Sequence, residues 1–491
     1  ARGRYGVGAI ATKDVAPNDV LVDVPFSAVL CRESLTNDAV VGSAKSEFFT
    51  LLYAEIDNRH SRHNRHAGAG GTPTSADETV VLATALLLER ADGDASPWSS
   101  WIATLPPRAG SPLSFSDVVV AAVPNGVATL RTDVLRSRVL VKKHHDYIRR
   151  FLSLAYRISK RNQGAFTNSA VYQSLRSIAE DSSSARTAWT WATEMVHSRA
   201  WSVLGKKYFT PLADAFNFAP HPDQFLPDYA YQTRGDIFVK SHQITTTGVV
   251  VKADRRAKKD GEVFETYGDN PNLIYFQYHG FVPEQNPSNC HHVQVASRVG
   301  YPSPLSFEQS ESKLTLLKLL KVPRGGYYCL PAATTVLPRG LQGFEPWYVD
   351  VLYIDSMQEG TAAAKASAWE HLPEMPKVPF WRDGNHQKDT LVVVRGRSAR
   401  LAMAALDGVV GAFSSDGGRA LQDAATAATS SDGSTDNDDD NGEDDVGSSS
   451  GGSSGVPVDA RDAAMILQYM EAQRVLLESW RKYAPPVHTE L

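Results

Sequence analysis

The segment FETYGDN, residues 264–270, carries the first side chain whose position raises a chemical question. Phe264 and the threonine after Glu265 are typical strand residues, and Tyr267 with Gly268 closes that strand. Because glycine has no Cβ, Gly268 would let another group approach the tyrosine closely. The sequence therefore leaves two interpretations of Tyr267, a functional hydroxyl or an aromatic residue that ends a strand and packs in the core.

Two further groups of residues could bind a ligand or a metal. Gly6 and Gly8 would let the backbone approach a ligand closely, although a glycine-relaxed strand or bulge is the alternative. They are not a dinucleotide fingerprint, because no third glycine opens a helix. In NRHSRHNRH, residues His60, His63 and His66 recur at every third position, but no carboxylate or cysteine is spaced to complete a metal site. We interpret this run as a solvated loop and predict no metal.

Composition limits the classes of protein. The chain has 491 residues, which suits two or three domains, and 42% of them are hydrophobic. Its formal charge of -5 gives no electrostatic case for nucleic-acid binding. No apolar run approaches the roughly 18 residues of a membrane helix. The chain has three cysteines, Cys31, Cys290 and Cys329, which are far apart in sequence. We therefore expect neither a disulfide framework nor a cysteine zinc site, and we expect the protein to be in a reducing compartment.

The elements that would position these residues fall into two parts. Apolar runs at 7–11 and 20–24 flank a polar turn, and helical spacing of apolar residues predicts helices over 78–90 and within 142–201. Strands return after Pro211 in GDIFVKSHQI, TGVVVKAD and EVFETYG, and NLIYFQYHGF predicts a short helix running into a turn.

After about residue 305 the pattern is mostly helical. Residues 413–456 are dominated by Ser, Gly, Asp and Ala, which cannot bury enough apolar area to offset chain entropy, so we predict a disordered acidic loop there. We expect a first domain over 1–282, with a helical insertion at about 50–200, and a helical substrate-binding domain over 283–491.

Five short pieces in the right order resemble the SET-domain protein-lysine methyltransferases, in the branch of the Rubisco large-subunit methyltransferase. They are YGVGAIATKDVAPNDVLVDVP, WSSWIATLP, VHSRAW, PLADAFNF and FETYG with the later YHGF. The resemblance implies an α+β fold, in which a SET-domain β-fold with a helical insertion surrounds a knot-like crossing and is followed by an all-α C-terminal domain. It also implies S-adenosylmethionine as methyl donor and a protein lysine as acceptor.

The resemblance assigns roles residue by residue. Tyr267 would be the catalytic tyrosine that orients the acceptor amine. The predicted donor contacts are Tyr5, Gly6, Val7, Arg199, Asn217 and Phe218, and the predicted acceptor contacts are Asp214, Tyr231 and Tyr278. Structural alternatives exist for three of them: Arg199 as a surface residue at a helix end, Asp214 as a cap or turn residue, and Tyr231 as a structural tyrosine.

The chain departs from the family pattern at two positions. The residue after Asn217 is usually histidine and here is Phe218, which keeps the main-chain contacts but loses the imidazole, and His221 could replace it. His279 stands where a tyrosine is expected, and Tyr278 comes one place early. These departures favour the alternative of a non-catalytic SET-like adaptor that binds a protein partner.

A branch that methylates histidine is a further alternative. That branch typically has Asn where Trp201 stands and Trp where Ala213 stands, so this chain looks more like the lysine-modifying pattern. We expect a monomer that acts on a protein with an exposed lysine, with neither nucleic acid nor membrane as partner. The compartment stays open between cytosol, nucleus and plastid.

Overall fold

The chain forms two compact units. The computed structural model describes residues 2–3, 6–64, 75–123, 128–167, 169–180, 182–203, 205–219, 237–283, 286–296, 305, 307–321, 327–370, 387–431 and 459–484. The first unit comprises Ala1–Phe115, Asp133–Asn270 and Ile274–Phe281, and the second comprises Ser116–Thr132, Pro271–Leu273 and Val282–Leu491.

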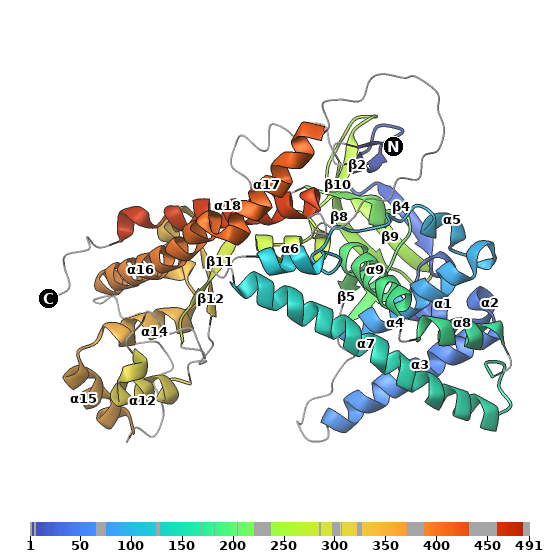
Figure 1. Cartoon of the computed structure of the whole chain (residues 1–491), viewed down its shortest axis with the longest axis horizontal. Helices are drawn as coiled ribbons and strands as arrows, with labels where there is room; N and C mark the ends of the chain where they lie inside the picture. Colours follow the sequence, from blue (N-terminus) through green and yellow to red (C-terminus); the bar gives the residue numbers. More distant parts are fainter. Residues whose placement is uncertain are drawn as a thin grey trace, which may run out of the picture. The chain divides into compact units, whose positions relative to one another are not determined.

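A mixed sheet in the first unit is organised around β10 (Glu262–Glu265), the strand that leads into Tyr267 (Figure 1). The strand order is β3-β10-β8-β9-β4, and β7 also pairs with β10. Strand β10 runs antiparallel to β3 but parallel to β7 and β8. The bounds are β3 (Ala9–Ile10), β4 (Val20–Pro25), β7 (Asn217–Phe218), β8 (Ile237–Ile244) and β9 (Gly248–Ala253). This pairing brings segments from both ends of the first 282 residues side by side.

Two small antiparallel ribbons complete the strands of this unit, β1 (Arg2–Gly3) with β2 (Gly6–Val7) and β5 (Trp201–Val203) with β6 (Lys206–Tyr208). The strand expected at 20–24 is present as β4, and the strand expected at 7–11 is present in shortened form as β3. They do not pair with each other, because β3 pairs with β10 and β4 with β9.

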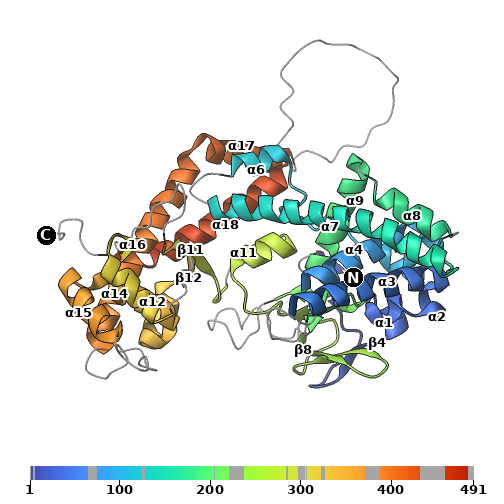
Figure 2. The same ribbon diagram turned by 90° about the horizontal axis from the view of Figure 1, so that it is seen from below.

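Helices of the insertion form the main core of the first unit. Phe48, Leu86 and Trp189 are fully buried between α3, α4 and α9, and Figure 2 shows these helices with α8. The bounds are α1 (Arg32–Leu35), α2 (Asp38–Val41), α3 (Ser43–Asn64), α4 (Ser75–Ala91), α5 (Ser99–Ile102), α7 (Ala128–Arg161), α8 (Ala170–Ile178) and α9 (Ser183–Arg199). The predicted helices over 78–90 and within 142–201 are therefore confirmed.

The short helix and turn expected from NLIYFQYHGF are also present. Helix α11 (Asn272–Ile274) continues as a π-helical turn over Tyr275–His279, and Gly280 ends it with φ of 72°. A Cβ at Gly280 would lie 2.5 Å from the Ala109 carbonyl oxygen and 2.7 Å from the Gly110 carbonyl carbon. Only glycine fits this left-handed, crowded position, and it fixes where the preceding Tyr278 and His279 point.

The second unit is helical, with one strand pair that the sequence did not predict. Strands β11 (Cys290–Gln294) and β12 (Tyr327–Pro331) form an antiparallel ribbon, and α12, α14 and α15 pack together (Figure 2). The helices are α6 (Asp117–Ala122), α12 (Glu311–Leu319), α13 (Ala333–Val336), α14 (Pro346–Ser356), α15 (Glu359–Glu370), α16 (Gln387–Ser414), α17 (Asp416–Ser431) and α18 (Ala460–Glu478).

Helix α17 corrects the expectation of disorder from residue 413. The segment RALQDAATAATSS has strong helix formers, and its Leu421 is fully buried where α17 packs against α18 (Figure 1). Composition over a long window obscured this local apolar face. The rest of the predicted loop, from residue 432, lies outside the described residues.

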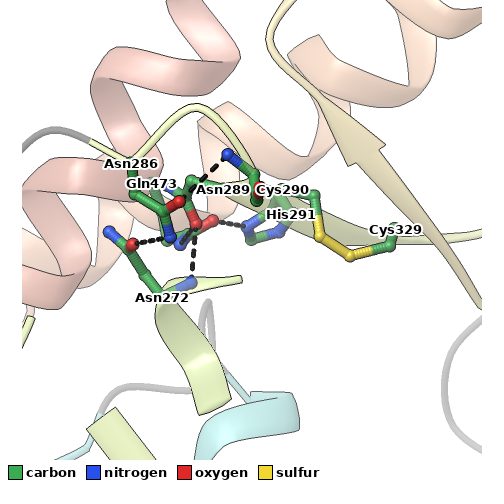
Figure 3. The surroundings of a disulfide bond; sticks show 8 residues. Asn272, Asn286, Asn289, Cys290, His291, Cys329 and Gln473 are labelled. Carbon is green, nitrogen blue, oxygen red and sulfur yellow. Dashed lines mark hydrogen bonds between the residues drawn. A yellow bond between two sulfur atoms is a disulfide. The ribbon is translucent and has the colours of Figure 1, made fainter. Parts of the chain in front are cut away.

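The cysteines also differ from expectation, because Cys290 and Cys329 form a disulfide across 39 residues of sequence (Figure 3). Separation in sequence is no obstacle, since β11 and β12 are neighbours in the ribbon. Cys31 is a free, fully buried thiol. Among the described helices, none combines the length and apolar character that crossing a membrane requires.

Candidate active site

A cavity of about 570 Å³ lies in the first unit where the sheet meets the insertion helices. It receives side chains from α7, α9, the β5–β6 ribbon, the loop before β7, the end of β10 and the π-helical turn. The predicted residues Arg199, Asp214, Tyr267 and Tyr278 all line it. The fold thus gathers into one cavity four candidates spread over 80 residues of sequence.

Tyr267 reaches this cavity from the end of β10. Its hydroxyl donates a hydrogen bond to the Phe216 carbonyl oxygen at 2.7 Å. Gly268 follows with φ of 97°, and the Asn270 side-chain amide donates to the Tyr267 carbonyl oxygen at 2.8 Å. Burial raises the pKa of the Tyr267 hydroxyl above its ordinary value, so the group is a neutral donor at physiological pH. The tyrosine is therefore held by both its main chain and its hydroxyl.

Aromatic rings also fix the Tyr267 ring. His279 stacks on it with centroids 4.8 Å apart and an interplanar angle of 29°. Phe218 lies 5.4 Å from it and also contacts Tyr275 and Phe281. Phe218 thus packs its side chain among aromatic rings, while its main chain belongs to β7 beside β10.

An ion pair forms a second part of the site. Arg199 ends α9, where a cation is favoured by the helix dipole, and its guanidinium donates to the Asp214 carbonyl oxygen at 2.9 Å and carboxylate at 3.2 Å. Trp101 donates to the same carboxylate at 3.1 Å. Burial raises the pKa of Asp214, although Arg199 and Trp101 oppose that shift. Asp214 therefore positions Arg199 rather than capping a helix.

The predicted donor contacts lie partly at a separate position. Asn217 donates through its side-chain amide to the Glu262 carboxylate at 2.8 Å, and a Cβ at Gly8 would lie 2.6 Å from both groups. Glycine at position 8 therefore lets the hydrogen-bonded Asn217 and Glu262 side chains pack directly against the backbone. Neither Gly8 nor Asn217 lines the cavity that contains Tyr267. Gly6 and Val7 form β2, whereas Tyr5, Tyr231 and His221 lie outside the described residues.

The sequence did not predict five basic side chains that line the cavity. They are His144 from α7, His197 from α9, Lys207 from β6, His242 from β8 and His279 from the π-helical turn. The Nδ1 atoms of the four histidines have no hydrogen-bond partner among the described residues, and Nε2 of His242 lies 2.8 Å from the Glu265 carboxylate. The only signal in the sequence was His279 in place of the expected tyrosine, because the five residues come from five separate elements.

Burial and mutual proximity keep three of these histidines, His144, His197 and His279, uncharged at neutral pH. Burial lowers the pKa of His197 to about 3, and those of His144 and His279 to about 4. Nearby Lys207 adds to the lowering for His197 and His279, and burial lowers the pKa of Lys207 itself. A further cation entering the cavity would be disfavoured for the same reasons.

Tyr278 and Trp201 complete the walls. The Tyr278 ring meets His197 edge to face at 5.0 Å, and burial raises the pKa of its hydroxyl. Trp201 stacks on Tyr208 at 4.9 Å and donates to the Thr210 hydroxyl at 3.0 Å. Ala213 lines the cavity without filling it. The chain thus has an aromatic-walled cavity in which Tyr267, the ion pair and neutral histidines face a common space.

No family model and no curated protein sequence matches this chain. Solved structures do. The structure of Rubisco LSMT bound to sinefungin and monomethyllysine is 13% identical at a TM-score of 0.50, over 98% of this chain and 85% of that one. The SET domain of LSMT bound to lysine and AdoHcy is 14% identical in sequence at a TM-score of 0.48, and Rubisco LSMT bound to AdoMet is 14% identical at a TM-score of 0.47. Both matches cover 98% of this chain and 85% of the other chain. The chain has the SET-domain fold, which the sequence predicted, as an α+β fold with a helical C-terminal region.

Proposed function

We propose that this protein is a protein-lysine N-methyltransferase that uses S-adenosylmethionine. The observation that carries the proposal is the fixed Tyr267 hydroxyl in a cavity that also holds the Arg199–Asp214 ion pair, within a SET-domain fold. The similar solved structures hold donor analogues and lysine, which agrees with this assignment. The acceptor would be a lysine side chain of a protein substrate.

The donor would supply a methyl group already activated by its positive sulfur. Gly8 brings two of the predicted donor-binding segments together, because its missing Cβ lets the Asn217 amide and the Glu262 carboxylate pack against the backbone that follows Gly6 and Val7. We assign the donor to this side, with main-chain contacts from Gly6, Val7 and Phe218. Arg199 would meet it from the cavity side.

The acceptor must lose its proton before it can attack. Presenting a neutral lysine at pH 7 costs about 4.6 kcal/mol, because its ordinary pKa is about 10.4. Burial between aromatic walls and the neighbouring basic side chain of Lys207 disfavour the ammonium form, and so lower this cost. The lowered pKa values of the buried histidines reflect the same surroundings, which would therefore favour a neutral amine in the cavity.

Tyr267 would orient that amine. Because its hydroxyl donates to the Phe216 carbonyl, the oxygen lone pairs are left to accept a hydrogen bond from an amine N–H. The amine lone pair could then point along the transfer axis, and alignment is the main contribution an enzyme makes to such a displacement. Asp214 would keep Arg199 in place, and Tyr278 would form part of the channel wall.

Two measurements on the full chain test the proposal. Calorimetry with S-adenosylmethionine should show heat of binding at millimolar donor or below. Incubation with radiolabelled donor and a lysate of the native organism should label proteins, and acid hydrolysis should then release methyl-lysine. Methyl-histidine as the product would move the assignment to the histidine-modifying branch. Absence of donor binding would overturn it.

A second candidate, a non-catalytic SET-like adaptor, has two observations in its favour. His279 stacks on the Tyr267 ring, and Phe218 packs among aromatic rings where the family has an imidazole. Such a protein would have a filled site and would bind its partner through the second unit. It predicts no donor binding and no labelled product, so the same two measurements separate the candidates.

A further inference from the structure

The ribbon of the second unit presents three side chains that can bind a metal on one face. Cys290 and His292 are two residues apart on β11, and His292 is paired with Cys329 on β12. Alternate residues of a strand share a face, and directly paired residues share it too. The two sulfur atoms and one ring nitrogen of His292 all lie within 4.8 Å of one another. Three donor atoms thus converge without any rearrangement of the backbone.

The opposite face of the same ribbon is part of the core, which fixes the strands. Val293, Tyr328 and Leu330 are buried, and Tyr328 stacks on Tyr348 at 3.7 Å. His291 also turns to this side, and its Nδ1 lies 3.0 Å from the Gln473 side-chain oxygen (Figure 3). The metal-binding face instead has half-buried His292 and Cys329 beside buried Cys290. Solvent ions can therefore reach a site whose geometry is rigid.

We propose that, once the Cys290–Cys329 disulfide is reduced, the two cysteine thiolates and His292 bind one Zn²⁺ ion. Two sulfurs and one imidazole are a ligand set that zinc accepts in tetrahedral geometry, with a water molecule in the fourth position. Magnesium and calcium prefer oxygen ligands and would be excluded.

The two states are related by a balanced exchange. Two molecules of a small thiol are oxidised to their disulfide, and their two electrons and two protons convert the Cys290–Cys329 bond into two thiols. Zn²⁺ then displaces one proton from each thiol to solvent and binds both thiolates. Oxidation reforms the sulfur–sulfur bond and releases the metal. The ribbon is therefore closed by a disulfide under oxidising conditions and by zinc under reducing ones.

Zinc titration of the full chain tests the proposal. The protein is reduced with a phosphine, freed of reductant and metal under nitrogen, and titrated against a chromophoric chelator that competes for Zn²⁺. We expect one tightly bound ion per chain in the reduced protein and none in the oxidised protein. Cys329→Ser and His292→Ala should each weaken binding more than about tenfold. Cys31→Ala should leave it unchanged, because that thiol is buried elsewhere.

Cobalt provides a readout that does not depend on affinity. Co²⁺ bound in place of zinc should give a thiolate charge-transfer absorption, which weakens in Cys290→Ser and Cys329→Ser. Circular dichroism of each variant checks that it is folded. Failure of the reduced, folded wild-type chain to bind zinc would overturn the proposal and leave an ordinary structural disulfide. Equal binding by the oxidised chain, or by both serine variants, would place the metal elsewhere and overturn it as well.

Discussion

At the scale of single residues, Tyr267 differs from a tyrosine in the packed core because its hydroxyl oxygen can still accept a hydrogen bond from a group in the cavity. It donates to a main-chain carbonyl and faces a cavity, so its oxygen can still accept. Tyr348 is the useful contrast, because its hydroxyl lies 3.0 Å from the Ser398 hydroxyl in a packed core. The two side chains have the same chemistry in different surroundings.

Replacement of Tyr267 by Phe should therefore lower the turnover rate while leaving donor binding nearly unchanged. A hydrogen bond made only in the transition state affects kcat more than KM. By analogy with the loss of one oxyanion donor, we expect a fall of about ten- to a thousandfold in kcat. Methyl incorporation into lysate proteins measures the turnover rate, and calorimetry measures the affinity for the donor. Tyr348→Phe is the matched control and should keep full activity; equal rates for both variants would remove the catalytic role of Tyr267.

Stability should fall in acid because of the buried histidines. His144 has a folded pKa of about 4, below an unfolded value of about 6.5, so the unfolded chain binds more protons below pH 6.5. The free energy of unfolding therefore decreases as the pH falls from about 6.5 toward 4. For His144 alone the decrease between pH 7.5 and 5 is about 2 kcal/mol. Urea unfolding at the two pH values should show a smaller difference in His144→Asn. An unchanged difference would mean that His144 is protonated in the native state.

At the scale of elements, the sequence predicted what local periodicity encodes. The apolar spacing in 78–90 and the Gly-ended segment NLIYFQYHGF each predicted an element that is present. The sequence did not predict the β11–β12 ribbon, because its strands CHHVQ and YYCLP are short, are separated by a long segment and pair only in the folded structure. The sequence also did not predict that His197 and Lys207 line one cavity, because nothing in their local sequences indicates that they come close together.

The π-helical turn depends on Gly280 in a way that sequence alone leaves open. A Cβ there would meet main-chain atoms of Ala109 and Gly110, which cannot move as a flexible side chain could. We expect Gly280→Ala to destabilise the protein by at least about 1 kcal/mol from the left-handed φ alone, and by more from the contact.

Denaturant unfolding measures this effect against Gly411→Ala. Gly411 lies in α16 with nothing near its missing Cβ, so alanine there should stabilise by up to about 1 kcal/mol. Opposite signs for the two substitutions are expected. If both stabilise, the turn at Gly280 is looser than the structure shows.

At the scale of the whole molecule, the resemblance predicted the fold class because the order of five motifs is a global property. It did not predict α17, which extends to Ser431 within the segment that was expected to be disordered. Leu421 is fully buried, so Leu421→Ala should lower the free energy of unfolding by about 2–5 kcal/mol and lower the melting temperature.

Deletion of residues 432–456, whose composition offers no core, should leave the melting temperature within about 2 °C of the wild type. A large fall for the deletion would show that this segment packs.

The burial of Cys31 has a practical consequence for spectroscopy. Desolvation raises the pKa of this thiol to about 12, and a protonated, inaccessible thiol reacts poorly with maleimides. With Cys290 and Cys329 joined to each other, the native chain offers no reactive thiol among its described residues. A single cysteine introduced at an exposed position, such as Val475, would then be the one site to accept a fluorophore or a spin label. The local motion of α18, which contains Val475, could be followed by spin-label spectroscopy without first removing any native cysteine.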